Sequence, residues 1–336
     1  MGDLFQEKWH RLGWQGIELS VPEEWNIGGI GGGREDGYLR VQDAELPRVE
    51  VKWGAVEGFV DIEATVNGYI KKLRQDKKAG KDIEIDTNAS VVSKRKMKKK
   101  ALSCFTWSTD VEGYGAAWYC PDCKRTVIVQ VTAKPEEDGP QLAERIITSL
   151  QDHPVGGWIR WATYGFQAQA PEGFHLTAQE LMAGHIQITL KRDIAAETAR
   201  NIMLQNLVAP EELTLSRWGM ANVMLKNKSL REWAEEEMGK RLKRMQPEMK
   251  PVEVNGHEAL QLSAQHLPFH QQFFRLIARL AEVPYADRIR GLIWHCPQSN
   301  SLHLVQMLVD INNQDLPAEI AGRFVCHPEE KTESQP

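Results

Sequence analysis

The chain has 336 residues, of which 42% are hydrophobic and 26% charged, and a formal net charge of −5. This is the composition of an ordinary globular protein of about two domains. The negative charge argues against nucleic acid as a partner, and no apolar run approaches the ~20 residues that span a bilayer. The N-terminus lacks the basic and apolar regions of a signal peptide, and five cysteines form no disulfide framework, so we expect a cytoplasmic protein without a membrane partner.

The first half of the chain predicts an antiparallel sheet with two helices. Three segments before residue 54 alternate apolar and polar residues with the two-residue period of a strand: 17–21, 37–41 and 48–53. Asp61 then opens a helix whose apolar residues recur at helical spacing and whose lysines gather toward its C-terminal end. Later strands are expected at 83–92, 101–107, 116–119 and 126–131, and a last helix at 140–150.

The same landmarks recur in the second half. The opening segment 14–25 returns as 163–174, Cys120-Pro121 returns as Cys296-Pro297, and His153-Pro154 returns as His327-Pro328. We therefore predict an internal duplication in which Cys120 is equivalent to Cys296 and His153 to His327. The predicted divisions are a first repeat at 1–154, a second repeat at 155–328 and a disordered polar tail at 329–336.

The second repeat also carries segments that the first lacks. Residues 192–210 are expected to be helical, and the helix at 229–245 corresponds to the helix that Asp61 opens. A further inserted helix carries Phe269, Phe273, Ile277 and Leu280 along one face. Because an uncovered patch of this kind invites aggregation, we expect this helix to pack against the other repeat.

Each repeat is thus predicted to be an α+β fold, with an antiparallel sheet of about six strands flanked by helices. Segments 16–25 and 165–174 share the pattern Gly-apolar-x-apolar-x-apolar-Pro-Glu-x-aromatic. This opening strand, followed by sheet strands, a middle helix, a hairpin and a terminal helix, resembles the PsbP-like superfamily, which includes the photosystem extrinsic subunit and the Ran-binding mog-type proteins. The resemblance implies a non-catalytic protein that binds other proteins. No functional residue can be assigned from it.

Cys120-Pro121-Asp122-Cys123 is the sharpest local motif. Two thiolates at this spacing can supply half of a tetrahedral zinc site. Two more ligands are needed, and the candidates are Cys104, His153, Cys296, Cys326 and His327. A thioredoxin-type redox motif is disfavoured, because the residues after it predict a strand and not a helix. The alternative is a tight hairpin turn with two small cysteines, which Ser299 in the equivalent place of the second repeat favours.

The glycine-rich segment 28–33 is not a phosphate loop. Its glycines do not match G-x-G-x-x-G, and Arg34-Glu35 stands where a Walker loop has Lys-Ser/Thr. A strand and not a helix follows, so no helix N-terminus is present to hold an anion. We expect a flexible loop between two strands.

A basic cluster lies between residues 71 and 100, where twelve Lys and Arg residues stand against four Asp and Glu residues. Such a patch can attract an acidic protein surface or polyphosphate. The alternative is a solvated helix end and hairpin whose lysines discourage pairing between sheet edges. The predicted binding patch comprises Lys71, Lys72, Arg74, Lys94, Arg95, Lys96, Lys98, Lys99 and Lys100.

No catalytic constellation is recognisable in the sequence. The leading hypothesis is therefore a non-catalytic macromolecule-binding or assembly protein with an unidentified protein partner. The first alternative is a zinc- or thiol-dependent factor that uses Cys120 and Cys123. The second is an enzyme with a site in a cleft between the two halves, where pockets commonly form.

Overall fold

The computed structural model describes residues 8–75, 83–93, 95–97, 100–192, 210–242, 247–265 and 285–327. These residues form mostly antiparallel sheet with a few helices, which confirms the α+β class. The chain divides into two compact units, Met1–Tyr164 and Gly165–Pro336. The helices expected within 192–210 and around Phe273, and the tail expected at 329–336, lie outside the described residues.

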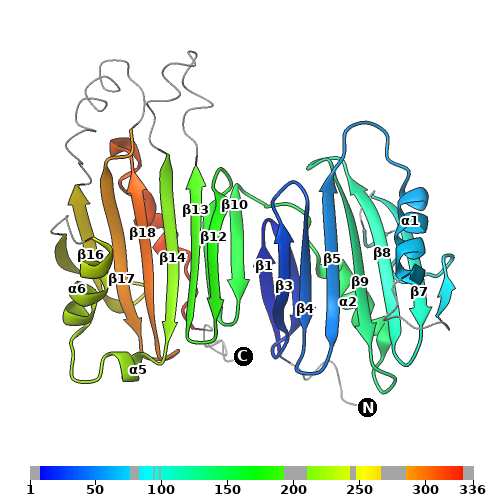
Figure 1. Cartoon of the computed structure of the whole chain (residues 1–336), viewed down its shortest axis with the longest axis horizontal. Helices are drawn as coiled ribbons and strands as arrows, with labels where there is room; N and C mark the ends of the chain where they lie inside the picture. The colour runs from blue at the N-terminus through cyan, green and yellow to red at the C-terminus, as the bar shows by residue number, and fades with distance from the viewer. Residues whose placement is uncertain are drawn as a thin grey trace, which may run out of the picture. The chain divides into compact units, whose positions relative to one another are not determined.

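The first unit contains a seven-stranded antiparallel sheet with the order β3-β4-β5-β9-β8-β7-β6 (Figure 1). Its strands are β3 (Asn26–Gly32), β4 (Gly37–Gln42), β5 (Pro47–Ala55), β6 (Glu84–Asp86), β7 (Ala101–Ser108), β8 (Glu112–Cys120) and β9 (Arg125–Ala133). The alternating segments at 37–41 and 48–53 pair as β4 and β5, as the sequence predicts.

The second unit contains a seven-stranded sheet with the order β12-β13-β14-β18-β17-β16-β15. Numbered from the first strand of each sheet, both sheets run 1-2-3-7-6-5-4. The strands of the second sheet are β12 (His175–Met182), β13 (His185–Arg192), β14 (Glu211–Gly219), β15 (Glu248–Val254), β16 (His257–Gln265), β17 (Arg288–Cys296) and β18 (Ser301–Val309).

A smaller sheet was not predicted. In the first unit β1 (Trp9–Trp14) pairs along its whole length with β2 (Ile17–Pro22) through a turn at Gln15-Gly16, and β1 also pairs with β10 (Trp158–Thr163). The second unit begins with β11 (Phe166–Pro171). Each large sheet therefore has seven strands where about six per repeat were predicted, and the prediction also omitted the smaller sheet.

Helices cover both faces of the first unit's large sheet. Helix α1 (Ile62–Gln75) packs on β7 and β8, where Val66 and Ile70 contact Phe105 and Ala117. Side chains alternate between the faces of a strand, so Trp118 faces the other side, where α2 (Gly139–Ser149) packs on β8 and β9. Helix α2 begins with Asp138, whose carboxylate accepts a hydrogen bond from the Gln141 backbone N–H, an N-cap.

The second unit has a comparable arrangement. Helix α6 (Leu230–Arg241) begins with a capping box between Ser229 and Glu232 and packs on β17. Helix α8 (Leu316–Gly322) packs on β17 and β18. The short α5 (Ala221–Met224) and the 3-10 turn η1 (Ile311–Asn313) complete the described helices.

The glycine-rich segment is a strand and not the expected loop. It forms β3, the edge strand of the sheet, and its pairing with β4 shifts between Ile27 and Gly29. A side chain at Gly28 would collide with Gln42, its neighbour on β4. The Gln42 side chain can move aside, so the position that requires glycine is Gly32, where φ is 70° and a Cβ would collide with the Asp36 carbonyl oxygen. Bulges such as the one between Ile27 and Gly29 are common at sheet edges.

The strand expected at 83–92 is much shorter, because β6 ends at Asp86. The Asp86 carboxylate accepts a hydrogen bond of 2.8 Å from the Asn88 backbone N–H, which turns the chain away from the sheet. Val91 and Val92 are buried without being paired in a strand. Their apolar character, which the sequence analysis assigned to a strand, reflects packing alone.

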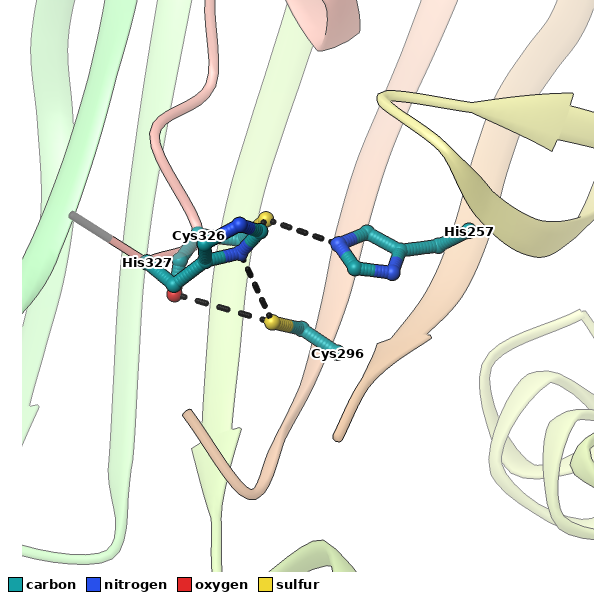
Figure 2. A group of neighbouring side chains, drawn as sticks. All are labelled: His257, Cys296, Cys326 and His327. Atoms are coloured by element: carbon teal, nitrogen blue, oxygen red, sulfur yellow. Dashed lines mark hydrogen bonds between the residues drawn. The ribbon is translucent and has the colours of Figure 1, made fainter. Parts of the chain in front are cut away.

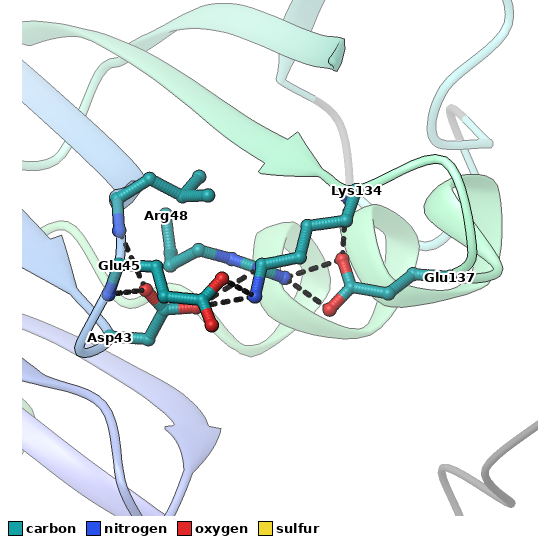
Figure 3. A network of polar contacts seen from close by, with 6 residues as sticks. Asp43, Glu45, Arg48, Lys134 and Glu137 are labelled. Atoms are coloured by element: carbon teal, nitrogen blue, oxygen red, sulfur yellow. Dashed lines mark hydrogen bonds and ion pairs between the residues drawn. The ribbon is translucent and has the colours of Figure 1, made fainter. Parts of the chain in front are cut away.

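A buried arginine fastens the β4–β5 hairpin of the first unit to the segment before α2 (Figure 3). Arg48 is 1% exposed and its guanidinium lies 4.3 Å from the Trp25 ring centroid. It donates to Asp43 at 3.2 Å and to both carboxylate oxygens of Glu137 at 2.6 Å. Burial alone would raise the pKa of Asp43, but hydrogen bonds from the Leu46 and Glu45 backbone and the charge of Arg48 together lower it.

Candidate metal centre

Three separate segments of the second unit meet at one end of its sheet. Strand β17 ends at Cys296, and a tight turn with Asn300 at φ 47° leads into β18. Strand β16 begins at His257 after a turn whose residues Asn255 and Gly256 have φ of 50° and 76°. Since Ala259 pairs with Trp294, the register places His257 opposite Cys296.

The third segment follows α8 and carries Cys326 and His327. It is held against the β15–β16 turn by Asn255, whose side-chain amide donates to the backbone carbonyls of Ala321 and Phe324 at 2.9 and 3.1 Å. We call His257, Cys296, Cys326 and His327 the second-unit cluster.

The donor atoms of the second-unit cluster converge on one point (Figure 2). All four lie within 4.8 Å of one another. His257 Nε2 lies 3.3 Å from Cys326 Sγ, and His327 Nδ1 lies 3.3 Å from the Sγ atoms of both Cys296 and Cys326. Zinc bonds of about 2.0–2.3 Å in a tetrahedron require ligand atoms about 3.3–3.8 Å apart. The three nitrogen–sulfur distances therefore match the edges of a zinc tetrahedron.

The second-unit cluster is largely shielded from water. His257, Cys296 and Cys326 are buried, and His327 is partly exposed. Burial, with a smaller contribution from His327, lowers the pKa of His257, so this imidazole is neutral and offers a lone pair. Burial raises the pKa of Cys326 to about 11, and the nearby Cys296 thiol adds to this effect. Metal binding would therefore release thiol protons.

The indole of Trp294, beside the second-unit cluster, can donate a hydrogen bond to a thiolate. Trp294 is completely buried, and among the described residues its Nε1–H has only a weak contact with the Cys326 sulfur. The Trp294 indole lowers the pKa of Cys326 and so opposes the effect of burial, which means that it favours the thiolate form. A metal-bound thiolate at Cys326 would be a stronger acceptor for this N–H than the thiol.

A related cluster occupies the same end of the first unit's sheet. Cys120 ends β8, and the turn to β9, with Lys124 at φ 53°, brings Cys123 back beside it. The donor atoms of Cys120, Cys123, Asp152 and His153 lie within 4.8 Å of one another. We call these four residues the first-unit cluster. His153 Nδ1 lies 3.5 Å from Cys120 Sγ and 2.8 Å from an Asp152 oxygen.

Asp152 of the first-unit cluster already has strong partners. Its Oδ2 accepts hydrogen bonds of 2.6 Å from both Lys100 Nζ and Trp118 Nε1. Its backbone carbonyl accepts from the guanidinium of Arg125, which is 4% exposed. Burial raises the pKa of Asp152, but the hydrogen bonds from Lys100 and Trp118 outweigh burial and lower it. Asp152 is therefore an ionised carboxylate in a salt bridge.

The structure separates the predicted ligands into two groups. Cys120 and Cys123 lie with His153, as the sequence analysis allowed, while Cys296, Cys326 and His327 lie together in the other unit. Cys104 lies within β7 and belongs to neither cluster. His257 and Asp152 were missed. Asp152 directly precedes His153 as Cys326 directly precedes His327, and this shared position was the signal that could have identified Asp152.

The predicted basic patch is described only in part, because Lys94, Lys98 and Lys99 lie outside the described residues. Lys71, Lys72 and Arg74 are exposed on α1, and Arg95 is exposed as well. Lys96 is exposed and forms an ion pair of 3.0 Å with Glu144. Lys100 differs from the others, since it points inward to Asp152 and its side chain is 21% exposed.

Comparisons with known proteins identify no family. No family model matches the chain, and no curated protein matches its sequence. The apo immunity protein TplEi of the T6SS from Pseudomonas aeruginosa is 7% identical in a match that covers 94% of this chain and 96% of that chain, with a TM-score of 0.34. A protein from Bacteroides thetaiotaomicron VPI-5482 is 11% identical over 73% of this chain and 82% of that chain, with a TM-score of 0.21.

Both TM-scores are too low to establish a shared fold or a shared function. The resemblance to the PsbP-like superfamily stays a prediction. Among the described residues, none of the helices has the length and apolar character that crossing a bilayer requires.

Proposed function

We propose that the chain is a non-catalytic protein whose second unit binds one structural zinc ion through His257, Cys296, Cys326 and His327. The observation that carries this proposal is the convergence of two sulfur and two nitrogen donors within 4.8 Å from three separate segments. Two cysteines and two histidines are a common closed ligand set for zinc. A catalytic zinc keeps an open position for water or substrate, whereas four protein ligands fill the tetrahedron.

The bound ion would fasten the end of the described chain to the sheet. Cys326 and His327 follow α8, whereas His257 and Cys296 stand at the ends of β16 and β17. Without the metal, the four ligand side chains are joined only by weak hydrogen bonds that involve thiols, and the segment is held beside them by Asn255 and by packing of Phe324 on Trp294. Structural zinc contributes directly to folding stability, because the unfolded chain has no preformed site.

Zinc fits the donor set better than other metals. A tetrahedral set of two sulfurs and two nitrogens is typical of zinc, whereas magnesium and calcium prefer oxygen ligands. A square-planar set of nitrogen and oxygen donors would point to copper(II) or nickel(II). The arrangement in the second-unit cluster follows the first pattern.

We further propose that the two units arose by internal duplication. This is supported by the shared strand order of the two large sheets and by the cysteine that ends the same strand in each, Cys120 in β8 and Cys296 in β17. The histidine that recurs in the sequence reaches this cysteine in both units, at 3.5 Å in the first and 3.3 Å in the second.

Metal analysis of the purified chain tests the zinc proposal. We expect about one zinc per chain by elemental analysis, and loss of this zinc in the double variant Cys296→Ser/Cys326→Ser. Cys104→Ser is the matched control, because Cys104 is a free cysteine outside both clusters. Cobalt(II) added to the metal-free chain should give the intense visible absorption of tetrahedral cobalt with thiolate ligands. A metal-free wild-type chain that takes up neither ion would refute the proposal.

A second candidate function is binding of a macromolecular partner, as the sequence analysis proposed. One observation favours it: Phe59, between β5 and α1 of the first unit, is 94% exposed. It borders a shallow pocket of about 340 Å³ that is also lined by Trp53, Val60 and Ile128. Exposed aromatic residues beside a pocket are typical of protein-binding surfaces.

Substitution of Phe59 tests this candidate. Phe59→Ser should leave the stability of the chain unchanged, because the ring is already in water, and should abolish copurification of the partner from the native cell. Val155→Ser is the control, since Val155 is 73% exposed outside that pocket. A partner that copurifies equally with both variants would exclude Phe59 as its contact.

A further inference from the structure

The two large sheets have four matching positions at the same end, of which two carry the same residue type and two carry different groups. Cys120 corresponds to Cys296 at the end of the strand, and His153 corresponds to His327. Because Ala101 pairs with Tyr119, the register sets Lys100 opposite Cys120, as His257 is set opposite Cys296. Asp152, which precedes His153, corresponds to Cys326. The histidine and cysteine that complete the second-unit cluster are thus a lysine and an aspartate in the first unit.

From this exchange we infer that the ammonium group of Lys100 takes, in the first unit, the place that the metal ion takes in the second, so that the chain binds one metal ion and not two. This inference rests on the proposed zinc site and identifies the residues that decide which cluster binds metal. Lys100 Nζ lies 2.6 Å from Asp152, and His257 Nε2 lies 3.3 Å from Cys326.

The charges around the first-unit cluster oppose a second cation. Lys100 lies against Asp152, and its ammonium also lies 5.2 Å from the Trp118 ring centroid. Arg125 pairs with Cys120 across the hairpin and donates to the Asp152 carbonyl. A divalent ion would be repelled by both side chains in a poorly solvated place, where charges are weakly screened. In the second unit the residue that pairs with Cys296 is Ser301, which carries no charge.

The donors of the first-unit cluster are also occupied. Asp152 Oδ2 accepts from Lys100 and Trp118, and Asp152 Oδ1 lies at hydrogen-bond distance from His153. The Cys123 thiol lies 3.8 Å from the Asp152 carbonyl oxygen, which is its acceptor. A metal at this cluster would have to break a buried salt bridge, whereas the second-unit cluster contains no salt bridge that must be broken.

Exchange of the deciding residues tests the inference by zinc stoichiometry, measured by native mass spectrometry of the full chain. Wild type should carry one zinc. Lys100→His/Asp152→Cys should carry two, since both units then present a histidine and a cysteine at the deciding positions. His257→Lys/Cys326→Asp should carry none. Hydrogen exchange of β8 and β17 checks that each variant remains folded.

A conservative variant keeps the inference testable if these exchanges prevent folding. Cys120→Ser/Cys123→Ser should retain one zinc, because the first-unit cluster holds none. Two zinc ions in wild type that fall to one in this variant would overturn the inference and leave the second-unit site standing. One zinc in wild type that is lost in this variant would overturn both proposals. No zinc in wild type would instead refute the proposed function.

Discussion

The two units reach the same strand order with different chemistry at matching places. At the end of the sheet, Lys100 and Asp152 form a salt bridge in the first unit, and two cysteines and two histidines converge in the second. Buried charge pairs and metal sites both satisfy polar groups that have left water. The shared strand order therefore determines where the segment at the end of each unit meets the sheet. It does not determine whether a salt bridge or a metal site holds that segment there.

A second ionic contact in each unit supports the same conclusion. The β4–β5 hairpin is closed by Asp43 and Arg48, whereas the β13–β14 hairpin is closed by Arg192 and Glu211, with the charges in the opposite order. In both units the arginine lies over an aromatic ring, that of Trp25 in the first and of Phe174 in the second. The aromatic contact is thus kept while the order of the charges is reversed.

The largest expected effect comes from removal of the metal. A ligand present at 1,000 times its Kd stabilises a folded protein by about 4 kcal/mol. Chelation should therefore accelerate hydrogen exchange in β16, β17 and β18 and leave β8 and β9 unchanged. Exchange measured by mass spectrometry resolves these strands. Equal acceleration in both units, or in neither, would contradict the assignment of the metal to the second unit.

Substitution of the first unit's carboxylate should have the next largest effect. Asp152→Asn leaves the Lys100 ammonium without its counter-charge, and breaking a buried ion pair costs about 3 kcal/mol. Urea unfolding followed by the fluorescence of the tryptophans should show this loss. Asp122→Asn is the control, since Asp122 is exposed in the adjacent β8–β9 turn. If Asp152→Asn is as stable as the control, the salt bridge does not fasten the first unit.

The smallest expected effect concerns the hairpin charges. Asp43→Asn retains a side-chain oxygen that can accept from the turn but loses its charge beside Arg48, which should cost about 1 kcal/mol at pH 7. The lowered pKa of folded Asp43 means that its contribution is fully present above the unfolded pKa and is lost as pH falls through the folded pKa.

Wild type and Asp43→Asn should therefore converge in free energy of unfolding as the pH falls through the folded pKa of Asp43, with Asp36→Asn, at an exposed carboxylate, as the control. A difference in stability that stays constant with pH would show that the charge of Asp43 contributes nothing. The reversed pair in the second unit would then need another explanation.

Local sequence patterns predicted most strands and helices but not all of their pairing. Alternation located β2, β4 and β5, and helical spacing located α1 and α2, because burial of one face imposes these periods. The edge strand β3 was missed because its glycines resemble a loop. The brevity of β6 depends on a side-chain hydrogen bond of Asp86, which periodicity does not reveal.

The sequence analysis predicted only part of the candidate site. It singled out Cys120 and Cys123, and Ser299, at the place equivalent to Cys123, favoured a hairpin turn over a zinc half-site. In the structure Cys326 and not residue 299 supplies the second thiol there, because the segment after α8 returns to the end of the sheet. His257 reaches the site only through the β16–β17 register, and a long-range register of this kind cannot be obtained from local spacing.

Zinc K-edge X-ray absorption of the zinc-loaded chain tests the central claim most directly. The account predicts a shell of two sulfurs at about 2.3 Å and two nitrogens at about 2.0–2.1 Å. The shell should be identical in Cys120→Ser/Cys123→Ser, whereas Cys296→Ser/Cys326→Ser should retain no zinc and give no such shell. A wild-type shell without sulfur, or one whose sulfurs disappear with Cys120 and Cys123, would contradict the zinc site in the second unit.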